Sequence, residues 1–326
     1  MRCIISKTNN PYLNLATEEF FLKSSNEEIF MLYVNEPCVV VGKHQNLLSE
    51  INLPYVIENK IKPARRLSGG GTVYQDLNNL NFSFIHNCSN LDQMNFSRFT
   101  APVLEALRAM GLPAEFSGRN DLLLEGYKIS GNAMHISKNR VLSHGTLLFN
   151  SDLKNLSAAL LIHPDKYICK SIKSVRSKVT NISNYLGHSV SLDQFSHHLF
   201  QLIIQSAANP YIKQVDDTES KSINQIAKEK FETWEWIYGY SPRYEFQNNI
   251  FLLNGSVGFK LIVEKGIIIK TVVNIDSDDN LIYLLAIESL KDVKHDYKII
   301  QDLLISNNKF NSHPTFNLSE FCSHLF

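Results

Sequence analysis

Apolar and polar residues in the first part of the chain alternate in patterns that predict short helices and strands. Asn10-Pro11 has the composition of a helix cap and first helical position, and apolar residues then recur at helical spacing up to Leu22. Two apolar runs rich in β-branched residues follow, at 29–34 and 38–41. Their lengths predict buried strands. The second run ends in a polar loop, a position where loops often hold ligands.

A glycine-rich stretch comes next and is the most informative part of the chain. Residues 65–84 read RRLSGGGTVYQDLNNLNFSF. Glycines 69–71 lack a Cβ, so the backbone there can take positive φ and bring its N–H groups against an anion, while Arg65 and Arg66 supply charge. The alternative is an ordinary glycine turn beside a surface arginine pair. Neither the P-loop pattern nor the dinucleotide fingerprint occurs in the chain.

The residues after the glycines predict a β-hairpin that begins at this anion cradle. Thr72 to Tyr74 are β-formers, residues 76–79 are a turn cluster, and Phe82 and Phe84 then alternate with polar residues. A helix is predicted near 99–110, because apolar residues recur there at helical spacing and Gly111 and a proline follow.

Two further predicted strands carry residues suited to catalysis or ligand binding. In the strand 127–130, Lys128 faces away from its apolar neighbours, and Gly131 then invites close approach of backbone. A solvated strand face is the alternative for that lysine. The strand 140–149 carries His144, and a lone histidine is more often a structural residue than a catalyst.

Residues 161–181 are basic, interrupted and poor in apolar periodicity, which predicts a long loop of the kind that closes over a site. A merely solvated loop is the alternative. Residues 119–181 hold ten Lys or Arg against four Asp or Glu, a local excess of +6 in a chain with 32 of each kind overall. This bias suits an anionic ligand.

The last third of the chain changes character. Helices are predicted at 191–207, capped by Ser191, and at 220–234; an aromatic cluster then ends at Ser241-Pro242. Beyond it, apolar runs between 251 and 275 are separated by glycine turns and predict a three-stranded meander, followed by helical patterns at 285–304 and 319–325. We therefore expect two domains, residues 1–240 and 244–326, the second a small α+β module.

Composition narrows the class of protein. The 326 residues are 44% hydrophobic and carry zero formal net charge, so the chain is globular and nucleic acid is a poor default partner. Five cysteines without a C-x-x-C pair argue against a disulfide framework or a zinc site and fit a reducing cytoplasm. No signal peptide and no window long enough to span a membrane is visible.

Ordered motifs over most of the first 240 residues resemble those of the two-domain bacterial lipoate–protein ligases. The matching segments are Asn14 to Ala16 with Glu18-Glu19, Val39 to Gly42 with Gln45-Asn46, Arg65 to Gly71, Ser117 to Leu122, Lys128 to Gly131, His144 to Leu147 and Ser174 to Asn181. The resemblance implies an α+β fold: a mixed-sheet catalytic domain like that of biotin and lipoate ligases and class II synthetases, plus a small α+β accessory domain.

The resemblance also implies a reaction and a set of site residues. Such enzymes use ATP and Mg²⁺ to convert lipoate to lipoyl-adenylate, then transfer the acyl group to one lysine of an apo lipoyl domain, in acyltransferase subunits of 2-oxoacid dehydrogenases or in the glycine-cleavage H protein. Lys128 is the implied catalytic residue. The other implied contacts are Arg66, Gly71, Thr72, Val73, Tyr74, Lys128 and Arg176 for ATP or the adenylate, Arg66, Gly70, Gly71, Lys128 and His144 for lipoate, and Asp121 for the metal.

Several alternatives stay open at this point. The related octanoyltransferases use a cysteine thiolate without ATP, and Cys169 lies among the lysines of the basic loop, where its pKa would be lowered. A lipoate-binding paralogue without catalysis would keep the same fold. The nucleotide loop typical of biotin ligases is missing. The sequence does not separate lipoate from octanoate, since a pocket distinguishes neighbouring acyl chains by only ~1–3 kcal/mol per methylene.

Overall fold

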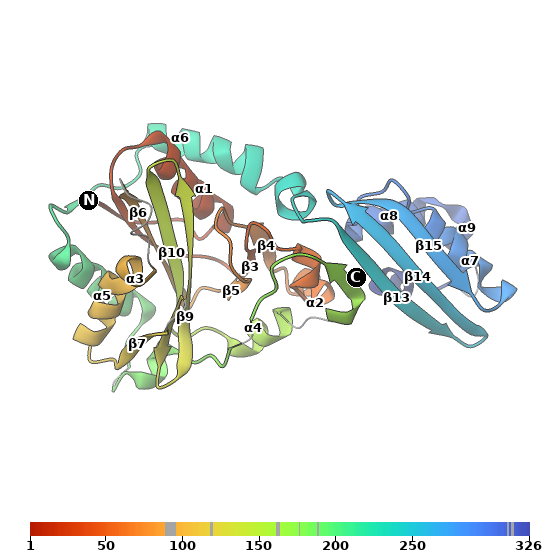
Figure 1. Cartoon of the computed structure of the whole chain (residues 1–326), viewed down its shortest axis with the longest axis horizontal. Coiled ribbons are helices and arrows are strands. Elements are labelled where there is room, and N and C mark those ends of the chain that lie inside the picture. Colours follow the sequence, from red (N-terminus) through yellow and green to blue (C-terminus); the bar gives the residue numbers. More distant parts are fainter. Residues whose placement is uncertain are drawn as a thin grey trace. The chain divides into compact units, whose positions relative to one another are not determined.

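The computed structural model describes residues 1–88, 96–117, 120–160, 164–175, 177–187, 189–311, 313 and 316–326. Its contacts divide the chain into two compact units (Figure 1). The larger unit consists of Met1–Lys43, Lys60–Ala159 and Ser174–Thr233, and the smaller of His44–Asn59, Leu160–Lys173 and Trp234–Phe326. The smaller unit thus includes two segments from earlier in the chain. A functional division at residues 240–244 stays a prediction.

The larger unit is built on an eight-stranded mixed sheet. Its strand order is β12 (Tyr211–Ile212), β1 (Arg2–Ile5), β2 (Ile29–Val34), β6 (Asn79–Asn87), β10 (Arg140–Leu148), β9 (Tyr127–Ser137), β8 (Asp121–Leu124) and β7 (Ala114–Ser117). Strand β1 pairs in parallel with β12 and β2, and the remaining neighbours are antiparallel. A separate three-stranded sheet has the order β4 (Lys62–Arg65), β3 (Cys38–Val41) and β5 (Val73–Gln75).

Helices cover both faces of the large sheet: α1 (Pro11–Ser24) lies on one, and α3 (Phe96–Ala109) with α5 (Leu192–Ser206) on the other. The larger unit also contains α4 (Leu153–Ala159), which contacts β5, and α6 (Asp217–Ile226), which contacts α1, with short turns η4 (Ile182–Tyr185) and η5 (Ala227–Phe231). The predicted caps are confirmed: Asn10 accepts a hydrogen bond from the Tyr12 N–H at 2.9 Å, and Ser191 forms a capping box with Gln194. Helix α6 begins earlier than predicted because Asp216 caps it.

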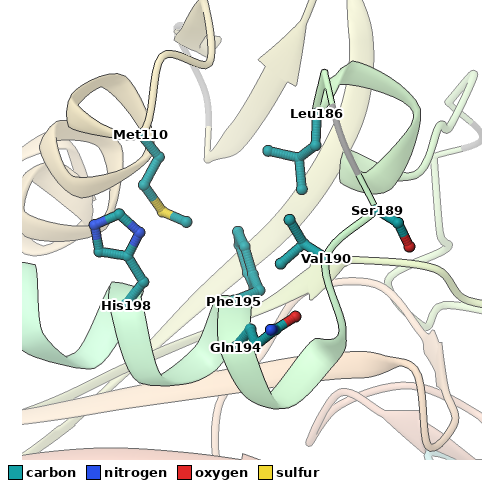
Figure 2. Close-up of a pocket in the computed structure, with 7 residues that line it drawn as sticks. All are labelled: Met110, Leu186, Ser189, Val190, Gln194, Phe195 and His198. Carbon is teal, nitrogen blue, oxygen red and sulfur yellow. The ribbon is translucent and has the colours of Figure 1, made fainter.

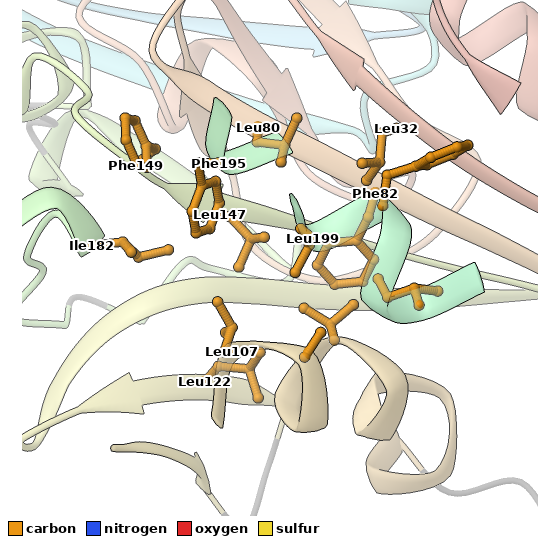
Figure 3. Packing of buried hydrophobic residues seen from close by; sticks show 14 of the residues in the cluster. Leu32, Leu80, Phe82, Leu107, Leu122, Leu147, Phe149, Ile182, Phe195 and Leu199 are labelled. Atoms are coloured by element: carbon orange, nitrogen blue, oxygen red, sulfur yellow. The ribbon is translucent and has the colours of Figure 1, made fainter. Parts of the chain in front are cut away.

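The main hydrophobic core lies on the face of the sheet that α3 and α5 cover (Figure 3). Phe82 from β6, Leu107 from α3 and Leu199 from α5 are all fully buried in it. Because successive strand residues point to opposite faces, the neighbours of Phe82 on β6 point to the other face, which carries α1. That second face holds the site described below.

The predicted hairpin after the glycines is wrong. Strand β5 pairs with β3 in the small sheet, whereas β6 pairs with β2 and β10 in the large one. The polar Asn81 of β6 is fully buried and is held by hydrogen bonds from Asn79 at 2.9 Å and to the Tyr33 carbonyl at 3.3 Å. These bonds satisfy the Asn81 amide inside the sheet.

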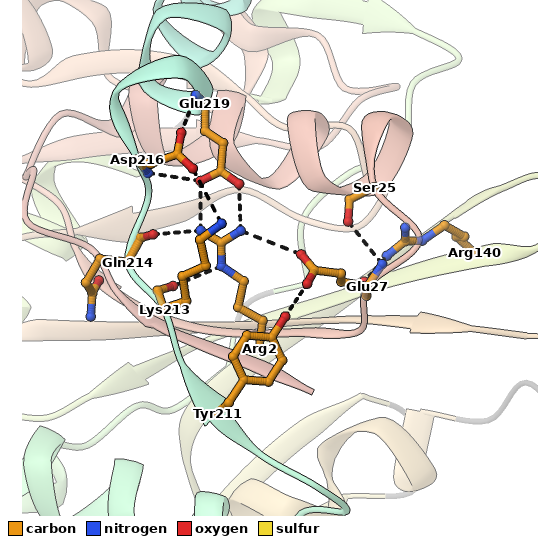
Figure 4. Close-up of polar contacts among 9 residues, drawn as sticks. All are labelled: Arg2, Ser25, Glu27, Arg140, Tyr211, Lys213, Gln214, Asp216 and Glu219. Atoms are coloured by element: carbon orange, nitrogen blue, oxygen red, sulfur yellow. Dashed lines mark hydrogen bonds and ion pairs between the residues drawn. The ribbon is translucent and has the colours of Figure 1, made fainter.

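Arg2 ties the first strand of the large sheet to the segment that precedes α6 (Figure 4). Its side chain is 1% exposed, and its guanidinium donates to both carboxylate oxygens of Glu219, at 2.6 and 2.7 Å. It also donates to the carbonyls of Lys213 at 2.9 Å and Gln214 at 2.7 Å. Only a planar guanidinium can donate to the carboxylate and both carbonyls at once, so Arg2 has a structural role.

The smaller unit contains an antiparallel four-stranded sheet, in the order β11 (Tyr167–Cys169), β13 (Tyr244–Leu252), β14 (Gly255–Glu264) and β15 (Ile267–Ile275). Its helices and turns are η1 (Leu47–Ser49), α2 (Leu53–Glu58), η3 (Pro164–Lys166), η6 (Glu235–Gly239), η7 (Asp278–Asn280), α7 (Leu281–Glu288), α8 (Tyr297–Ser306), α9 (Asn308–Asn311) and α10 (Leu318–Ser323). The predicted small α+β module is present.

Two predictions for this unit need correction. The meander gains a fourth strand, β11, from within the stretch that was predicted to be a loop, because Tyr167 packs against Tyr244 and Phe246 of β13. The helical pattern at 285–304 is two helices, since Asp292 takes a φ of +66° and Asp296 caps α8. Every helix among the described residues is too short or too polar to cross a membrane.

Candidate active site

The glycine loop connects β4 to β5 and lies against the end of β3. Gly70 takes a φ of +88°, the left-handed conformation predicted for this loop. The approach is close: a Cβ on Gly42 would lie 2.2 Å from the Gly70 carbonyl oxygen, and the Lys43 N–H donates to the Ser68 carbonyl at 2.8 Å. Gly42 therefore has no room for a Cβ, and the positive φ of Gly70 favours glycine there.

The Arg66 side chain holds this loop through hydrogen bonds to its backbone carbonyls. Its side chain is buried, and its Nη2 donates to the carbonyls of Gly69 and Gly71, both at 2.7 Å. Nη1 donates to the Val40 carbonyl at 2.9 Å, and Nε donates to Ser68 Oγ at 3.0 Å. Burial lowers the pKa of Arg66 to about 10, which leaves the guanidinium charged at neutral pH. Arg66 is thus a brace for the loop, and its predicted contact with ATP or lipoate stays a prediction.

Because a trans peptide points its N–H opposite to its C=O, fixing the two carbonyls toward Arg66 fixes the following N–H groups away from it. These belong to Gly70 and Thr72. The Thr72 N–H donates to Ser174 Oγ at 2.9 Å, and Ser174 also lies against Gly71, where a Cβ would come within 3.2 Å of Oγ. On the side away from Arg66, Ser174 therefore occupies the Thr72 N–H, and the Gly70 N–H points to that same side.

A buried polar chain continues from Ser68 to helix α1. Ser68 Oγ lies 2.6 Å from His144 Nε2, and His144 Nδ1 lies 2.9 Å from Glu18 Oε2. The Tyr33 hydroxyl donates to Glu18 Oε1 at 3.1 Å. All four side chains are less than a tenth exposed. His144, predicted as a lipoate contact, is thus linked directly to the glycine loop.

Lys128 lies beside this loop on β9. Its amine is 3.0 Å from Asp121 Oδ1, and its side chain packs over Gly131, where a Cβ would lie 3.3 Å from Nζ. That Cβ would also lie 4.0 Å from Val73, which follows the glycine loop. The Lys128 side chain is 24% exposed, so the amine is accessible. Gly131 lets the lysine lie flat along the strand, as its position in the sequence suggested.

The backbone of Lys128 is also fixed. Its N–H donates to the Lys178 carbonyl at 2.8 Å, and its carbonyl accepts from the Thr180 N–H at 3.1 Å. The end of the predicted loop at 161–181 is therefore hydrogen-bonded to the strand that carries the lysine. Together with Ser174, this brings the segment against both the glycine loop and Lys128.

The structure thus places most of the predicted site residues on one face of the large sheet. Gly70 lies near Ala133, at 3.8 Å from a Cβ built on the glycine, and Ala133 pairs with His144 across β9 and β10. Tyr74 is buried in β5 opposite Val39. Arg176 lies outside the described residues. Sequence reasoning did not assign roles to Ser68, Glu18 and Ser174, although all three occur inside the motifs that carry the family resemblance.

The metal prediction rests on Asp121 alone. The described residues contain no group of three or more His, Cys, Asp or Glu side chains arranged to hold a metal. Mg²⁺ commonly uses only one or two carboxylates and completes its shell with water and substrate phosphates. Asp121 is a partly exposed carboxylate beside the Lys128 amine, so it fits the role of a single protein ligand in such a shell.

Cys169, the candidate nucleophile of the alternative mechanism, is part of β11 in the smaller unit. It is half-buried, and its thiol lies 2.9 Å from Ser171 Oγ. The two candidate catalytic residues, Cys169 and Lys128, therefore belong to different units.

A separate apolar pocket of about 310 Å³ contains none of the predicted site residues (Figure 2). It lies between the end of α3 and the first half of α5, and Met110 and His198 face each other across it. Its other lining residues are Leu186, Ser189, Val190, Gln194 and Phe195.

The mixed sheet and the glycine loop beside a lysine define the class of protein: an α+β protein with the lipoate ligase-like fold, as the solved structures below bear out. A lipoate–protein ligase A bound with ATP is 26% identical, covers 73% of this chain and 98% of its own, and has a TM-score of 0.62. A bi-partite lipoate protein ligase from Thermoplasma acidophilum, studied with its E2 lipoyl domain, is also 26% identical, covers 73% of this chain and 96% of its own, and has a TM-score of 0.63.

The family follows from the sequence comparisons. Residues 10–204 match the family model of the lipoyl protein ligase A/B catalytic domain. Lipoate-protein ligase LplJ of Bacillus subtilis is 43% identical over 262 residues, which cover 79% of each chain. The chain belongs to the lipoate–protein ligase family and is an enzyme of this type.

Proposed function

We propose that the enzyme activates lipoate with ATP to form lipoyl-adenylate and then transfers the lipoyl group to a lysine of a lipoyl domain. Its relatives support each part: they are lipoate–protein ligases, one of which is bound with ATP and another of which was studied with its E2 lipoyl domain. The acceptors are acyltransferase subunits of 2-oxoacid dehydrogenases and the glycine-cleavage H protein. Octanoate fits the same chemistry, because each buried CH₂ contributes about 0.8 kcal/mol to acyl-chain binding.

The observation that carries the proposal is the accessible Lys128 amine beside the glycine loop. In adenylation, a lipoate carboxylate oxygen attacks the α-phosphorus of ATP, and the bond from that phosphorus to the pyrophosphate oxygen breaks. Both reactants are anions, so the site must neutralise charge before they meet. Lys128 would place its charge between the α-phosphate and the acyl oxygen. Gly70, Gly71, Thr72, Val73 and Tyr74 would line the nucleotide through backbone groups.

Transfer uses the same amine. The neutral acceptor lysine amine attacks the acyl carbonyl carbon, the carbon–oxygen bond to AMP breaks, and the proton that the nitrogen loses passes to solvent. Negative charge develops on the carbonyl oxygen and on the departing phosphate, and Lys128 would stabilise both. No nucleophile from the enzyme is needed, since the adenylate is already activated.

When bound, Mg²⁺ would add positive charge at the phosphates, and Asp121 is the residue that would hold it. Asp121 also positions the Lys128 amine through their 3.0 Å ion pair. Arg176 would contact the adenylate from its own loop.

The test is a single assay with purified protein, lipoate, Mg-ATP and an apo lipoyl domain, read by intact mass of the acceptor and by pyrophosphate release. We expect modification of one acceptor lysine only when ATP is present. Modification without ATP from an acyl-carrier donor, abolished by Cys169→Ser, would instead support the octanoyltransferase mechanism. Binding of lipoate without either reaction would support a non-catalytic paralogue.

A further inference from the structure

We infer that Glu18 is a positioning residue that holds the glycine loop in its ligand-binding conformation through His144 and Ser68. The inference rests on the proposed function, because the ligand of the loop is proposed there. Glu18 is 2% exposed on α1, and its carboxylate accepts from Tyr33 and His144 at 2.9 to 3.1 Å. This buried carboxylate therefore has a fixed orientation toward His144.

The hydrogen bonds along this chain have one consistent direction. Arg66 Nε can only donate, so Ser68 Oγ accepts from it at 3.0 Å. The Glu18 carboxylate can only accept, so His144 Nδ1 carries a proton and donates it at 2.9 Å. In the neutral imidazole Nε2 is then the acceptor, and the Ser68 hydroxyl donates to it at 2.6 Å. The Glu18 carboxylate thus selects the histidine tautomer that Ser68 needs.

The chain ends at the loop carbonyls. Arg66 donates to Gly69 and Gly71 as well as to Ser68, so the orientation of its guanidinium sets the direction of the loop peptides. Glu18 also supplies negative charge to the Arg66 guanidinium, whose charged form is disfavoured by burial. Replacing the carboxylate with an amide removes that charge and one acceptor at once. We expect the loop to open more often as a result.

The first experiment measures the loop without ligand. Amide hydrogen exchange is followed by mass spectrometry in peptides covering residues 67–74, in wild type and Glu18→Gln. We expect roughly tenfold faster exchange in the variant, because a buried bond to a charged group is lost. Glu19→Gln is the matched control: Glu19 is the next residue, is also buried, and pairs with Lys23 and Lys230 instead of His144. Its exchange should stay within about twofold of wild type.

The second experiment tests the pathway by a double-mutant cycle on lipoyl-adenylate formation. Glu18→Gln and Ser68→Ala should each slow the reaction roughly 10–100-fold, and the double variant should be no slower than the worse single one. The effects would multiply if Glu18 contacted the ligand directly. Multiplying effects, or unchanged loop exchange in Glu18→Gln, would overturn the inference.

Tyr33→Phe covers the case in which Glu18→Gln does not fold. It keeps the charge and removes one hydroxyl donor, so it should move loop exchange in the same direction by a smaller factor, and unchanged exchange would count against the inference. Failure of the proposed function has a different signature: wild type would form no adenylate, while the exchange measurements would still report on the loop.

Discussion

Replacing Lys128 with alanine removes an amine that the structure places next to Asp121 and near the glycine loop. Its contribution to folding is small, because the pair is about a quarter exposed and such ion pairs contribute roughly 0.2–1 kcal/mol. Its contribution to the reaction is larger. Losing one preorganised group at a site of developing charge costs about 2.7–4 kcal/mol, or roughly 10²–10³-fold in turnover. We therefore expect a folded but nearly inactive Lys128→Ala.

The measurement is ATP-dependent lipoylation in parallel with thermal unfolding. Lys260→Ala is the control, since its amine also lies 3.0 Å from a carboxylate, that of Glu245, in a more exposed pair in the smaller unit. It should keep wild-type activity. Lys128→Arg should restore little, because a planar fork does not replace a compact charge between two oxygens. A Lys128→Ala enzyme with more than about a tenth of wild-type turnover would refute the assigned role.

Three further outcomes follow from contacts elsewhere in the chain. Burial lowers the pKa of His295 to about 4 from its ordinary 6.5. The neutral histidine therefore adds about 3 kcal/mol to the free energy of unfolding above pH 6.5, and this is lost as pH falls toward 4. In urea titrations, the free energy of unfolding of His295→Phe should lack this dependence on pH. Arg2→Ala should lower the free energy of unfolding by about 3 kcal/mol, whereas Lys213→Ala, with its exposed pair, should change it little, both by urea titration. Gly42→Ala should displace the glycine loop and reduce lipoylation at least tenfold, with Gly187→Ala, which has nothing within 4 Å of its new Cβ, as the unaffected control.

Local sequence signals predicted local structure well. Helix α1 begins where Asn10 and its proline indicated, and the strands at 29–34 and 38–41 have the predicted bounds. The errors involve partners far away in the chain. Strand β6 was assigned to a hairpin because its pattern does not reveal that β2 and β10 flank it, and β11 forms only because β13 offers an edge. Three residues such as 167–169 have no strand signal of their own.

The motifs singled out in the sequence lie near one another in the fold: the glycine loop approaches Ala133, which pairs with His144, and Lys128 packs over Gly131. The binding and catalytic roles of these residues stay predictions. Glu18 looked like an ordinary acidic residue of a helix, and nothing in its spacing shows that it meets His144, which comes 126 residues later. Burial of a polar group is a property of the folded chain, so its function becomes visible only with the structure.

The cations of the site divide into two kinds by exposure. Arg65 and Arg66, which the sequence suggested as charges for the ligand, are 0% and 6% exposed. Arg65 Nη1 donates to the carbonyls of Gly42 and Lys43, both at 3.1 Å, and Arg66 donates to the Gly69 carbonyl and to Ser68 Oγ. A guanidinium suits that task, since its planar N–H groups reach several carbonyls at once. Lys128, at 24% exposure, keeps a compact charge accessible to a ligand. A glycine loop held by buried arginines, and next to it a partly exposed lysine amine paired with Asp121, are the features that the proposed adenylation would use, because donors and charge are then fixed before the anions arrive.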